Sequence, residues 1–510
     1  TTFPITINPL ETGVIIIDCL PTTLGLIEDS MVLNSPDLPE GISVHLSVTG
    51  SDGNILSGTL SGELPSAVYR ITGDINVVSG DELILLAGTE FLFDGQYNFN
   101  IAGDIKAQGT ELDSIIFDNY GNENWRGFTL AYVTEETVFN YVRISGAVKE
   151  DGGGMKLFES NPILTNVIIT DNATSDGDGG GMYLENSDPT LINVIISDNL
   201  AFWGAGGGVY LTNSSPTMMY GAISRNASGG KGGGLSLSAS NPTLTHVTIS
   251  DNIAGDEDCG GAMTLSGSNP ILTHVTITGN TAICAPAMRV SASDPILTNV
   301  TISWNTSLSD GMAAMQFFNS NPILTNTIIW GNSSLYYGSS FSSWSSTIII
   351  TYSNIAGGWE GEGNIDFDPL FSDPANDDFT LLEDSPCIDA GDPGVYQSDN
   401  TVSDIGAYPY NQALPDADFT SDVTTGNPPL TVQFTDNSSL GSLGAPLVSW
   451  SWNFGDGTST EQNPSYMFQS GGIYTIALTV TDSMGFSETE IKEDYINVTA
   501  TYIHNLDIAG

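Results

Sequence analysis

Basic residues are scarce in this chain of 510 residues. Ten Lys and Arg stand against sixty Asp and Glu, which gives a formal net charge of −50. Only 14% of the residues are charged, so the acidity comes from a shortage of bases. Such a surface is a poor partner for nucleic acid. It favours divalent cations or a salty medium, and acidity that merely keeps an extracellular protein in solution explains it equally well.

Long apolar runs are absent too. No stretch approaches the roughly 18 apolar residues that a membrane-spanning helix needs, so we expect no transmembrane segment. The chain begins at Thr1 rather than with Met, which fits a processed protein whose signal peptide has been removed. We therefore expect a secreted protein, located outside the cell or at the cell surface.

What the sequence does contain is a repeat. Seven units of about 27 residues each carry a proline that is followed ten residues later by an asparagine. The prolines are Pro162, Pro189, Pro216, Pro242, Pro270, Pro295 and Pro322, and the asparagines are Asn172, Asn199, Asn226, Asn252, Asn280, Asn305 and Asn332. A fixed period of this length indicates a solenoid, in which each unit buries its apolar face against its neighbours.

Three short apolar runs recur in each unit, with period-2 alternation and many Val, Ile and Thr residues. The runs are too short for helices and are typical of strands. Three short strands per unit predict a parallel β-helix whose coils stack ~4.8 Å apart. The recurring asparagines then lie at one corner of successive coils, where we expect a structural ladder of hydrogen-bonded side chains.

Four cysteines occur in the chain. Cys259 and Cys284 each lie four residues before the same apolar position in adjacent units. Stacked coils would bring their Cα atoms to ~5 Å, within the range of a disulfide. We predict this bridge, which implies an oxidising compartment. Cys19 and Cys387 are far apart in sequence, and the pattern assigns neither of them a partner.

Two parts of the chain resemble known families. The runs Gly-Gly-Gly-Met-x-Leu and Leu-Thr-Asn-Val-x-Ile-x-x-Asn resemble the right-handed parallel β-helix repeats of secreted bacterial proteins, both pectate-lyase-like enzymes and adhesin-like proteins. Pro429–Phe434, Trp450–Gly457, Asn463–Tyr466 and Tyr474–Asp482 resemble a PKD domain. These resemblances imply an all-β protein: a right-handed parallel β-helix solenoid followed by an immunoglobulin-like β-sandwich. Such a sandwich serves as a spacer or adhesion module and performs no catalysis.

The expected domains follow from these patterns. They are an N-terminal β region or cap (1–68), the parallel β-helix (69–366), a C-terminal capping segment (367–412), a PKD-like β-sandwich (413–500) and a tail (501–510). A cap is required because an open last coil exposes unpaired backbone groups. A terminal strand such as Phe3–Ile7 is a candidate to pair with a neighbouring molecule.

Acidic residues gather in two of the variable loops, and calcium is the one cofactor that we consider for this chain. The candidate ligands are Asp176, Asp178, Asp256, Glu257 and Asp258. The two clusters lie three coils apart, so they cannot form one site. Each cluster holds a calcium ion alone or consists of solvated loop acids.

The outward-pointing residues of the repeat include few side chains that could take part in catalysis. Glu185 is the only carboxylate in the two columns beside the variable loop, so we assign no catalytic residue. Tyr183 and Tyr210 stack on this face and either contact carbohydrate or pack against each other. His246 and His274 occupy equivalent positions that hold asparagine in most other units. They replace asparagine at a turn, or they form a metal pair.

Two functional hypotheses remain. The first is a non-enzymatic, secreted structural or adhesive protein, which binds extracellular carbohydrate or joins copies of itself into filaments through its termini, end to end or by strand exchange. The alternative is a polysaccharide lyase or glycoside hydrolase with its site in the irregular early coils. Asp94, Asp104, Asp113, Asp118 and Arg126 lie in those coils. An assay for unsaturated products or new reducing ends separates the two.

Overall fold

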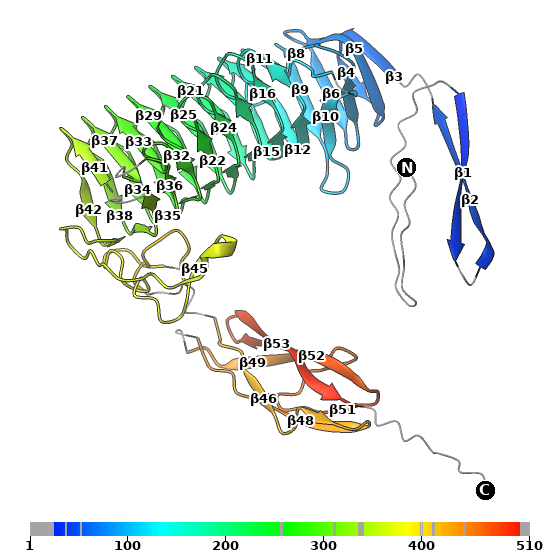
Figure 1. The fold of residues 1–510 in the computed structure, drawn as a ribbon, viewed down its shortest axis with the longest axis vertical. Coiled ribbons are helices and arrows are strands. Elements are labelled where there is room, and N and C mark those ends of the chain that lie inside the picture. Colours follow the sequence, from blue (N-terminus) through cyan, green and yellow to red (C-terminus); the bar gives the residue numbers. More distant parts are fainter. Residues whose placement is uncertain are drawn as a thin grey trace. The chain divides into compact units, whose positions relative to one another are not determined.

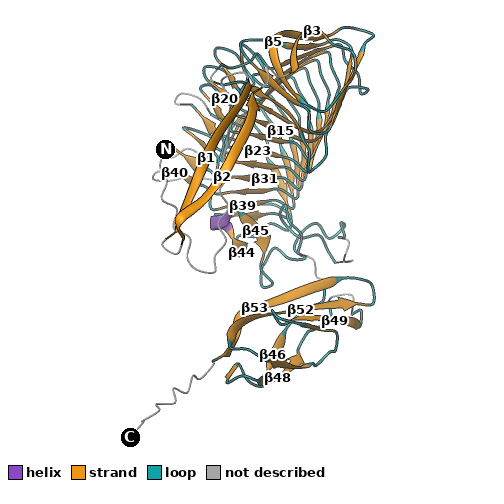
Figure 2. Ribbon diagram, turned by 90° about the vertical axis from the view of Figure 1, so that its right-hand side faces the viewer, coloured by secondary structure: helices purple, strands orange, loops and turns teal. Residues whose placement is uncertain are grey.

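The computed structural model contains two compact units, Thr1–Ser236 and Leu237–Gly510, which are described in turn. It describes residues 25–499 except 36–37, 51–53, 122, 256–258, 310–312, 335–340, 398, 400, 411–413 and 442–443, and of residues 25–50 the backbone alone. Figure 2 shows strands throughout, and among the described residues the only helix is the short η1 (Pro374–Asn376).

The first unit opens with an antiparallel hairpin of β1 (Gly25–Ser35) and β2 (Leu38–Gly50). Parallel pairing begins with β3 (Asn54–Thr59), which pairs with β5 (Val68–Val77). The parallel strands therefore start before residue 69, which is the residue at which the sequence predicted the start of the β-helix. Neither β3 nor β4 (Gly62–Leu64) has a fully buried residue, so both lack the apolar alternation by which a sequence reveals a strand.

Aromatic side chains fill the interior of the irregular coils that follow. Their strands are β6 (Glu82–Leu86), β7 (Glu90–Phe93), β8 (Phe99–Ile101), β9 (Asp104–Gln108), β10 (Ile115–Asn119), β11 (Phe128–Ala131) and β12 (Val138–Ser145). Phe93 stacks on Trp125 at 4.2 Å, and Phe117 meets the edge of Phe128 at 4.8 Å. All four rings are completely buried, so this part of the core depends on large rings that interlock.

Regular coils begin near residue 155, and Figure 1 shows their strands stacked coil on coil. One coil consists of β17 (Met182–Glu185), β18 (Thr190–Ile192), β19 (Ile195–Ser197) and β20 (Leu200–Ala201). It thus has four short strands where the sequence predicted three. Asn186, Asn193 and Asp198 have φ values of 49°, 52° and 58° and break the chain into short strands, because Asn and Asp tolerate this left-handed conformation.

The other regular coils of the first unit repeat this arrangement, except that in the first of them one long strand, β15 (Ile163–Thr170), pairs with both β18 and β19. Their strands are β13 (Val148–Lys149), β14 (Met155–Phe158), β15 (Ile163–Thr170), β16 (Ala173–Thr174), β21 (Val209–Thr212), β22 (Thr217–Met219), β23 (Ala222–Ser224), β24 (Ala227–Ser228) and β25 (Leu235–Ser238), the last of which reaches into the second unit. The strands of neighbouring coils pair in register. For example, Met182, Tyr183 and Leu184 pair with Val209, Tyr210 and Leu211.

Two polar ladders run through the corners of these coils. The Asn172 amide donates to Asn199 Oδ1 at 3.1 Å, and the Asn199 amide donates to Asn226 Oδ1 at 3.0 Å. A second ladder joins the backbone N–H of Ser160 to Ser187 Oγ at 2.9 Å. All of these residues are buried, so the ladders satisfy groups that would otherwise be costly to enclose.

The second unit continues the regular pattern. Its coil strands are β26 (Thr243–Thr245), β27 (Thr248–Ser250), β28 (Ile253–Ala254), β29 (Met263–Ser266), β30 (Ile271–Thr273), β31 (Thr276–Thr278), β32 (Thr281–Ala282), β33 (Met288–Ser291), β34 (Ile296–Thr298), β35 (Thr301–Ser303), β36 (Thr306–Ser307), β37 (Met315–Phe318), β38 (Ile323–Thr325), β39 (Ile328–Trp330), β40 (Ser333–Ser334), β41 (Phe341–Trp344), β42 (Ile349–Thr351) and β43 (Asn354–Ile355). A second amide ladder runs through Asn252, Asn280, Asn305 and Asn332, with donor–acceptor distances of 2.9–3.0 Å.

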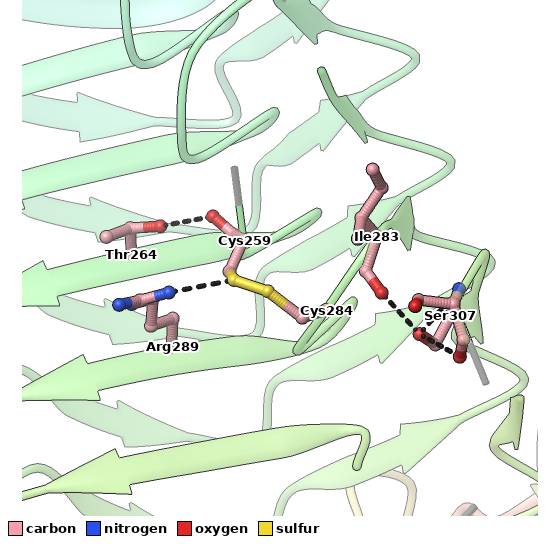
Figure 3. The surroundings of a disulfide bond; sticks show 7 residues. Cys259, Thr264, Ile283, Cys284, Arg289 and Ser307 are labelled. Atoms are coloured by element: carbon pink, nitrogen blue, oxygen red, sulfur yellow. Dashed lines mark hydrogen bonds between the residues drawn. A yellow bond between two sulfur atoms is a disulfide. The ribbon is translucent and has the colours of Figure 1, made fainter. Parts of the chain in front are cut away.

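A disulfide joins Cys259 to Cys284, as the repeat register predicts, with their Cα atoms 4.7 Å apart (Figure 3). The guanidinium of Arg289 donates to Cys259 Sγ at 2.8 Å, and Thr264 Oγ1 donates to the Cys259 carbonyl at 2.9 Å. Cys387 is a buried free thiol, whose pKa burial raises to about 11. Cys19 lies outside the described residues.

The capping segment covers more than the end of the last coil. It includes β44 (Phe371–Asp373) and β45 (Asp378–Leu381), and its residues 391–410 run back over three earlier corners. The N–H of Asp392 donates to Asn326 Oδ1 at 2.8 Å, Asn299 donates to the Asp404 carbonyl at 2.9 Å, and His274 Nδ1 donates to the Ala407 carbonyl at 3.1 Å. We call residues 391–410 the strap.

The C-terminal sandwich has two antiparallel layers. One contains β46 (Phe419–Ser421), β48 (Leu430–Asp436) and β51 (Ser465–Phe468), and the other contains β47 (Thr425–Gly426), β49 (Leu447–Asn453), β50 (Thr458–Ser459), β52 (Gly472–Asp482) and β53 (Ser487–Val498), with β47 parallel to β53. Trp452 is completely buried, and its indole N–H donates to the Glu461 carbonyl at 2.9 Å. Tyr466 is half-buried and stacks on Phe454 at 4.1 Å. Both side chains therefore belong to the core.

Candidate functional site

Three outward side chains line up in the regular coils of the first unit. Strands β14, β17 and β21 pair in register, which places Lys156, Tyr183 and Tyr210 at equivalent outward positions. The two tyrosine rings stack with centroids 5.2 Å apart and planes 18° from parallel. The ammonium of Lys156 lies 4.8 Å from the centroid of Tyr183. The Tyr183 ring therefore lies between the Lys156 ammonium and the Tyr210 ring.

Two carboxylates lie beside this stack. Asp151 and Asp178 each precede a run of three glycines in adjacent coils. The carboxylate of Asp151 pairs with Lys156 at 2.9 Å and accepts the Asp178 N–H at 3.3 Å. Asp178 Oδ1 accepts the Ala205 N–H at 2.7 Å. We call Asp151, Lys156, Asp178, Tyr183 and Tyr210 the tyrosine–aspartate cluster.

Partial burial shifts the protonation of the cluster. It raises the pKa of Asp178, and the neighbouring Asp151 adds to the effect while the Ala205 N–H opposes it. Burial and the charge of Glu185 raise the pKa of Tyr183 to about 12. Burial also lowers the pKa of the nearby Lys149 to about 8, with the charge of Lys156 contributing. Such grouped shifts mark candidate binding sites, although structural networks produce them too.

Sequence reasoning missed Asp151 in this region and named Asp178 only as a candidate calcium ligand. Asp151 and Asp178 occupy the same corner position as the two bridged cysteines, so the register could have placed them beside the tyrosines. Two exposed aromatic residues on the next loop were also overlooked. Trp203 is 71% exposed and packs edge-on against Phe202, with centroids 4.9 Å apart. Unlike the stacked tyrosines, Trp203 protrudes from its loop, two residues before Ala205.

The predicted calcium ligands do not converge where the structure describes them. Asp176 is exposed, while Asp178 is bound to Ala205. Asp256, Glu257 and Asp258 lie outside the described residues. Within the described part of the chain, no group of three or more His, Cys, Asp or Glu residues lies close enough to hold a metal ion. Calcium binding in these loops remains a prediction.

The two histidines adopt the geometry of the asparagines that they replace. His246 and His274 have φ values of 52° and 53°, like Asn193. Their rings stack 4.8 Å apart and only 12° from parallel, so their nitrogen lone pairs do not converge on one point as metal ligands must. The stack lines a cavity of about 340 Å³ under the strap. Burial and the charge of His274 lower the pKa of His246.

The acids of the early coils have separate partners. Arg70 pairs with Asp94, Thr137 Oγ1 donates to Asp104 at 3.4 Å, and Arg126 donates to Gln96 at 2.6 Å. The backbone N–H of Asp113 donates to Thr110 Oγ1 at 3.1 Å, and Asp118 Oδ1 accepts the Asn119 N–H at 2.7 Å. No described contact joins these residues to one another.

Two family models match the chain. The right-handed β-helix region matches residues 75–282, and the PKD domain matches residues 412–498. This protein is a right-handed parallel β-helix followed by a PKD domain. Within its described residues, no helix has the length and apolar character needed to cross a membrane.

Curated relatives of the β-helix–PKD protein match over short segments. It is 46% identical over 54 residues to collagenase ColA of Bacillus cereus, covering 9% of this chain and 6% of that protein. It is 44% identical over 66 residues to the pre-pro-metalloprotease PrtV of Vibrio cholerae, covering 11% of this chain and 7% of that protein. The matches thus span less than a tenth of either relative.

Two solved structures are similar to this chain over different lengths. The PKD1 domain of Vibrio cholerae PrtV is 34% identical and covers 17% of this chain and 99% of that domain, with a TM-score of 0.15. The tailspike protein 2 enzymatic domain of bacteriophage CBA120 is 10% identical and covers 94% of this chain and 79% of that one, with a TM-score of 0.36.

Proposed function

We propose that this protein is a secreted, non-enzymatic structural or adhesive protein that contacts extracellular carbohydrate through the tyrosine–aspartate cluster and Trp203. The observation that carries the proposal is the way the cluster is built. Its Lys156–Asp151 ion pair, its Asp178–Ala205 hydrogen bond and its stacked rings fix outward polar groups on rigid strands. A surface fixed in this way favours recognition, because its groups need no reordering when a ligand binds.

Each part of the surface has a chemical role in this proposal. The indole of Trp203 supplies an exposed aromatic surface on which the C–H side of a sugar ring can pack. The hydroxyls of Tyr183 and Tyr210 and the carboxylate of Glu185 supply hydrogen bonds to sugar hydroxyls. The expected ligand is a soluble, hydroxyl-rich oligosaccharide, because the acidic chain as a whole repels polyanions.

A binding measurement tests this function. Soluble oligosaccharides from an array are titrated calorimetrically against the wild type and against Trp203→Ala, and we expect the substitution to weaken binding about tenfold. Trp344→Ala is the matched control, since Trp344 is 52% exposed but lies in the second unit. Tyr210→Phe separates the hydroxyl from the ring. Wild-type protein that binds no oligosaccharide would refute the proposal.

The enzymatic alternative has one observation in its favour. Lys149 has a pKa of about 8, which is suited to proton transfer, and its charge environment includes Asp151 and Arg126. Its ammonium, however, donates to the Phe128 carbonyl at 3.2 Å and to Thr129 Oγ1. Acidic polysaccharides incubated with the protein should yield neither unsaturated products nor new reducing ends. Turnover that disappears in Lys149→Met would establish the alternative.

Self-assembly is a specific form of the structural role. Among the described residues, β3 and β4 pair on one side only, with β5 and β6. Leu56, Leu60 and Leu64 in this first coil are only partly buried, so a second copy would gain backbone hydrogen bonds and apolar contact there. Negative-stain electron microscopy, with and without calcium, should show filaments that Leu56→Glu abolishes. Isolated particles at all concentrations would exclude this form.

A further inference from the structure

A line of exposed isoleucines crosses the second unit. Strands β30, β34, β38 and β42 pair in parallel and in register. Their first residues, Ile271, Ile296, Ile323 and Ile349, are 44%, 40%, 41% and 48% exposed. Each is followed two residues later by a partly buried outward threonine, from Thr273 to Thr351. We call these four pairs the isoleucine–threonine face.

The fold itself does not require isoleucine at these positions. In the neighbouring strand β26, both outward residues are threonine, Thr243 and Thr245, and that strand pairs in the same register with β30. β-branched residues of either kind suit an exposed parallel strand. Single exposed apolar residues are ordinary, whereas these four adjoin one another in successive coils. Because the fold does not require isoleucine here, we consider which partner could bind this row.

Charge and area limit what that partner is. The face carries no charged residue, and the carboxylate of nearby Asp294 is bound to the N–H of Asn321 at 2.6 Å. An uncharged face therefore favours a neutral partner. Four strands of three residues present on the order of 200 Å², whereas a stable protein interface buries about 800 Å² per partner.

We propose that the isoleucine–threonine face binds the ordered surface of a neutral polysaccharide, and this proposal rests on the adhesive function proposed above. A packed, uncharged polysaccharide repeats its C–H faces and hydroxyls at fixed spacing. The face repeats a methyl-rich side chain and a hydroxyl once per coil, with Thr325 Oγ1 and Thr351 Oγ1 3.5 Å apart. Weak contacts add along the row, because the coils hold every side chain in place.

Sedimentation with insoluble polysaccharide tests the proposal. Full-length protein is mixed with crystalline cellulose and with crystalline chitin, and the bound fraction is measured at several salt concentrations. Ile271→Asp with Ile296→Asp should reduce binding about tenfold, because each carboxylate must lose water against the neutral surface. Ser266→Asp is the matched control, since Ser266 is exposed on another strand of the Ile271 coil. Melting curves of all variants show whether they remain folded.

Each outcome bears on the proposal. Loss in the double variant and retention in the control support it, and binding that survives moderate salt supports a neutral ligand. Equal binding by the wild type and the double variant would overturn it, as would wild-type protein that binds neither crystalline polymer. Association of the wild type with itself that the double variant lacks would instead assign the face to a second copy. Calorimetry with Trp203→Ala reports on the other site, so the two proposals fail separately.

Discussion

The irregular coils before residue 140 and the regular coils after residue 155 build the same parallel stack by different means. The early interior is a network of buried rings, such as Phe93 on Trp125 and Phe117 against Phe128. The regular interior is aliphatic, with polar ladders at its corners, as at Asn172 and Ser160. Coils of unequal length need large side chains to fill a changing cross-section, whereas equal coils let one small amide repeat at every corner.

The largest effect should come from the aromatic interior. Phe117→Ala should destabilise the first unit by about 4 kcal/mol, because it leaves a cavity against Phe91 and Phe128. Leu184→Ala in a regular coil is the control and should cost about 3 kcal/mol. Urea unfolding measures the loss, and hydrogen exchange shows which coils open. If exchange rises evenly through both kinds of coil, they are not stabilised independently.

The asparagine ladder should come next. Asn280→Ala removes an amide that donates to the Ile249 and Thr278 carbonyls and accepts the Asn252 N–H. These groups are buried, so we expect a loss of about 3 kcal/mol. Asn269→Ala is the control: its Oδ1 accepts the Asp294 N–H at 2.7 Å in an exposed turn, and it should cost about 0.5 kcal/mol. Equal losses in the two variants would contradict a special role for the ladder.

The disulfide should matter less than the ladder. Cys259→Ala with Cys284→Ala removes a link across 25 residues. We expect a loss of about 2 kcal/mol, in the lower part of the usual range, because paired strands on both sides already hold these coils together. Reduction of the wild type should lower its thermal midpoint by as much as the double substitution does. A larger loss than that of Asn280→Ala would mean that the ladder alone does not hold the regular coils.

The two regions also differ in what their sequences reveal. In the regular coils the fixed spacing identified the fold and the pairing of Cys259 with Cys284, because the same offset in each unit means the same place in each coil. A serine also stands two residues before every repeat proline, as Ser160 and Ser187 do. The serine ladder could therefore have been predicted from that spacing. The start of the parallel strands at Asn54 could not have been predicted from the sequence. That first coil buries no side chain, so its residues show no clear apolar pattern.

Repeat spacing cannot predict a site in which a later segment of the chain folds back over earlier coils. The strap reaches His274 from Ala407, across more than a hundred residues, and no periodicity relates the two. The tyrosine–aspartate cluster falls between these cases. Register alone predicts that Tyr183 stacks on Tyr210. Asp151 lies at a corner of its coil, outside the two outward columns in which the tyrosines stand.

The junction between the two kinds of coil contains the smallest predicted effect. Lys149 follows the last irregular coil, and burial lowers its pKa from 10.5 to about 8. Its charged form is thus penalised in the folded state. That penalty is fully present below about pH 8, where both states are charged, and it is lost above 10.5, where both are neutral. Stability should therefore rise with pH across this window.

Lys149→Met should remove this dependence. At pH 7 we expect the variant to be about 1 kcal/mol more stable than the wild type, because the lost hydrogen bonds to Phe128 and Thr129 offset part of the relieved burial. The difference should vanish or reverse by pH 10.5, as urea unfolding at both pH values will show. The exposed Lys231→Met is the control and should change stability by less than about 0.5 kcal/mol at either pH. An equal gain at both pH values would mean that packing, rather than the buried charge, limits stability at this junction.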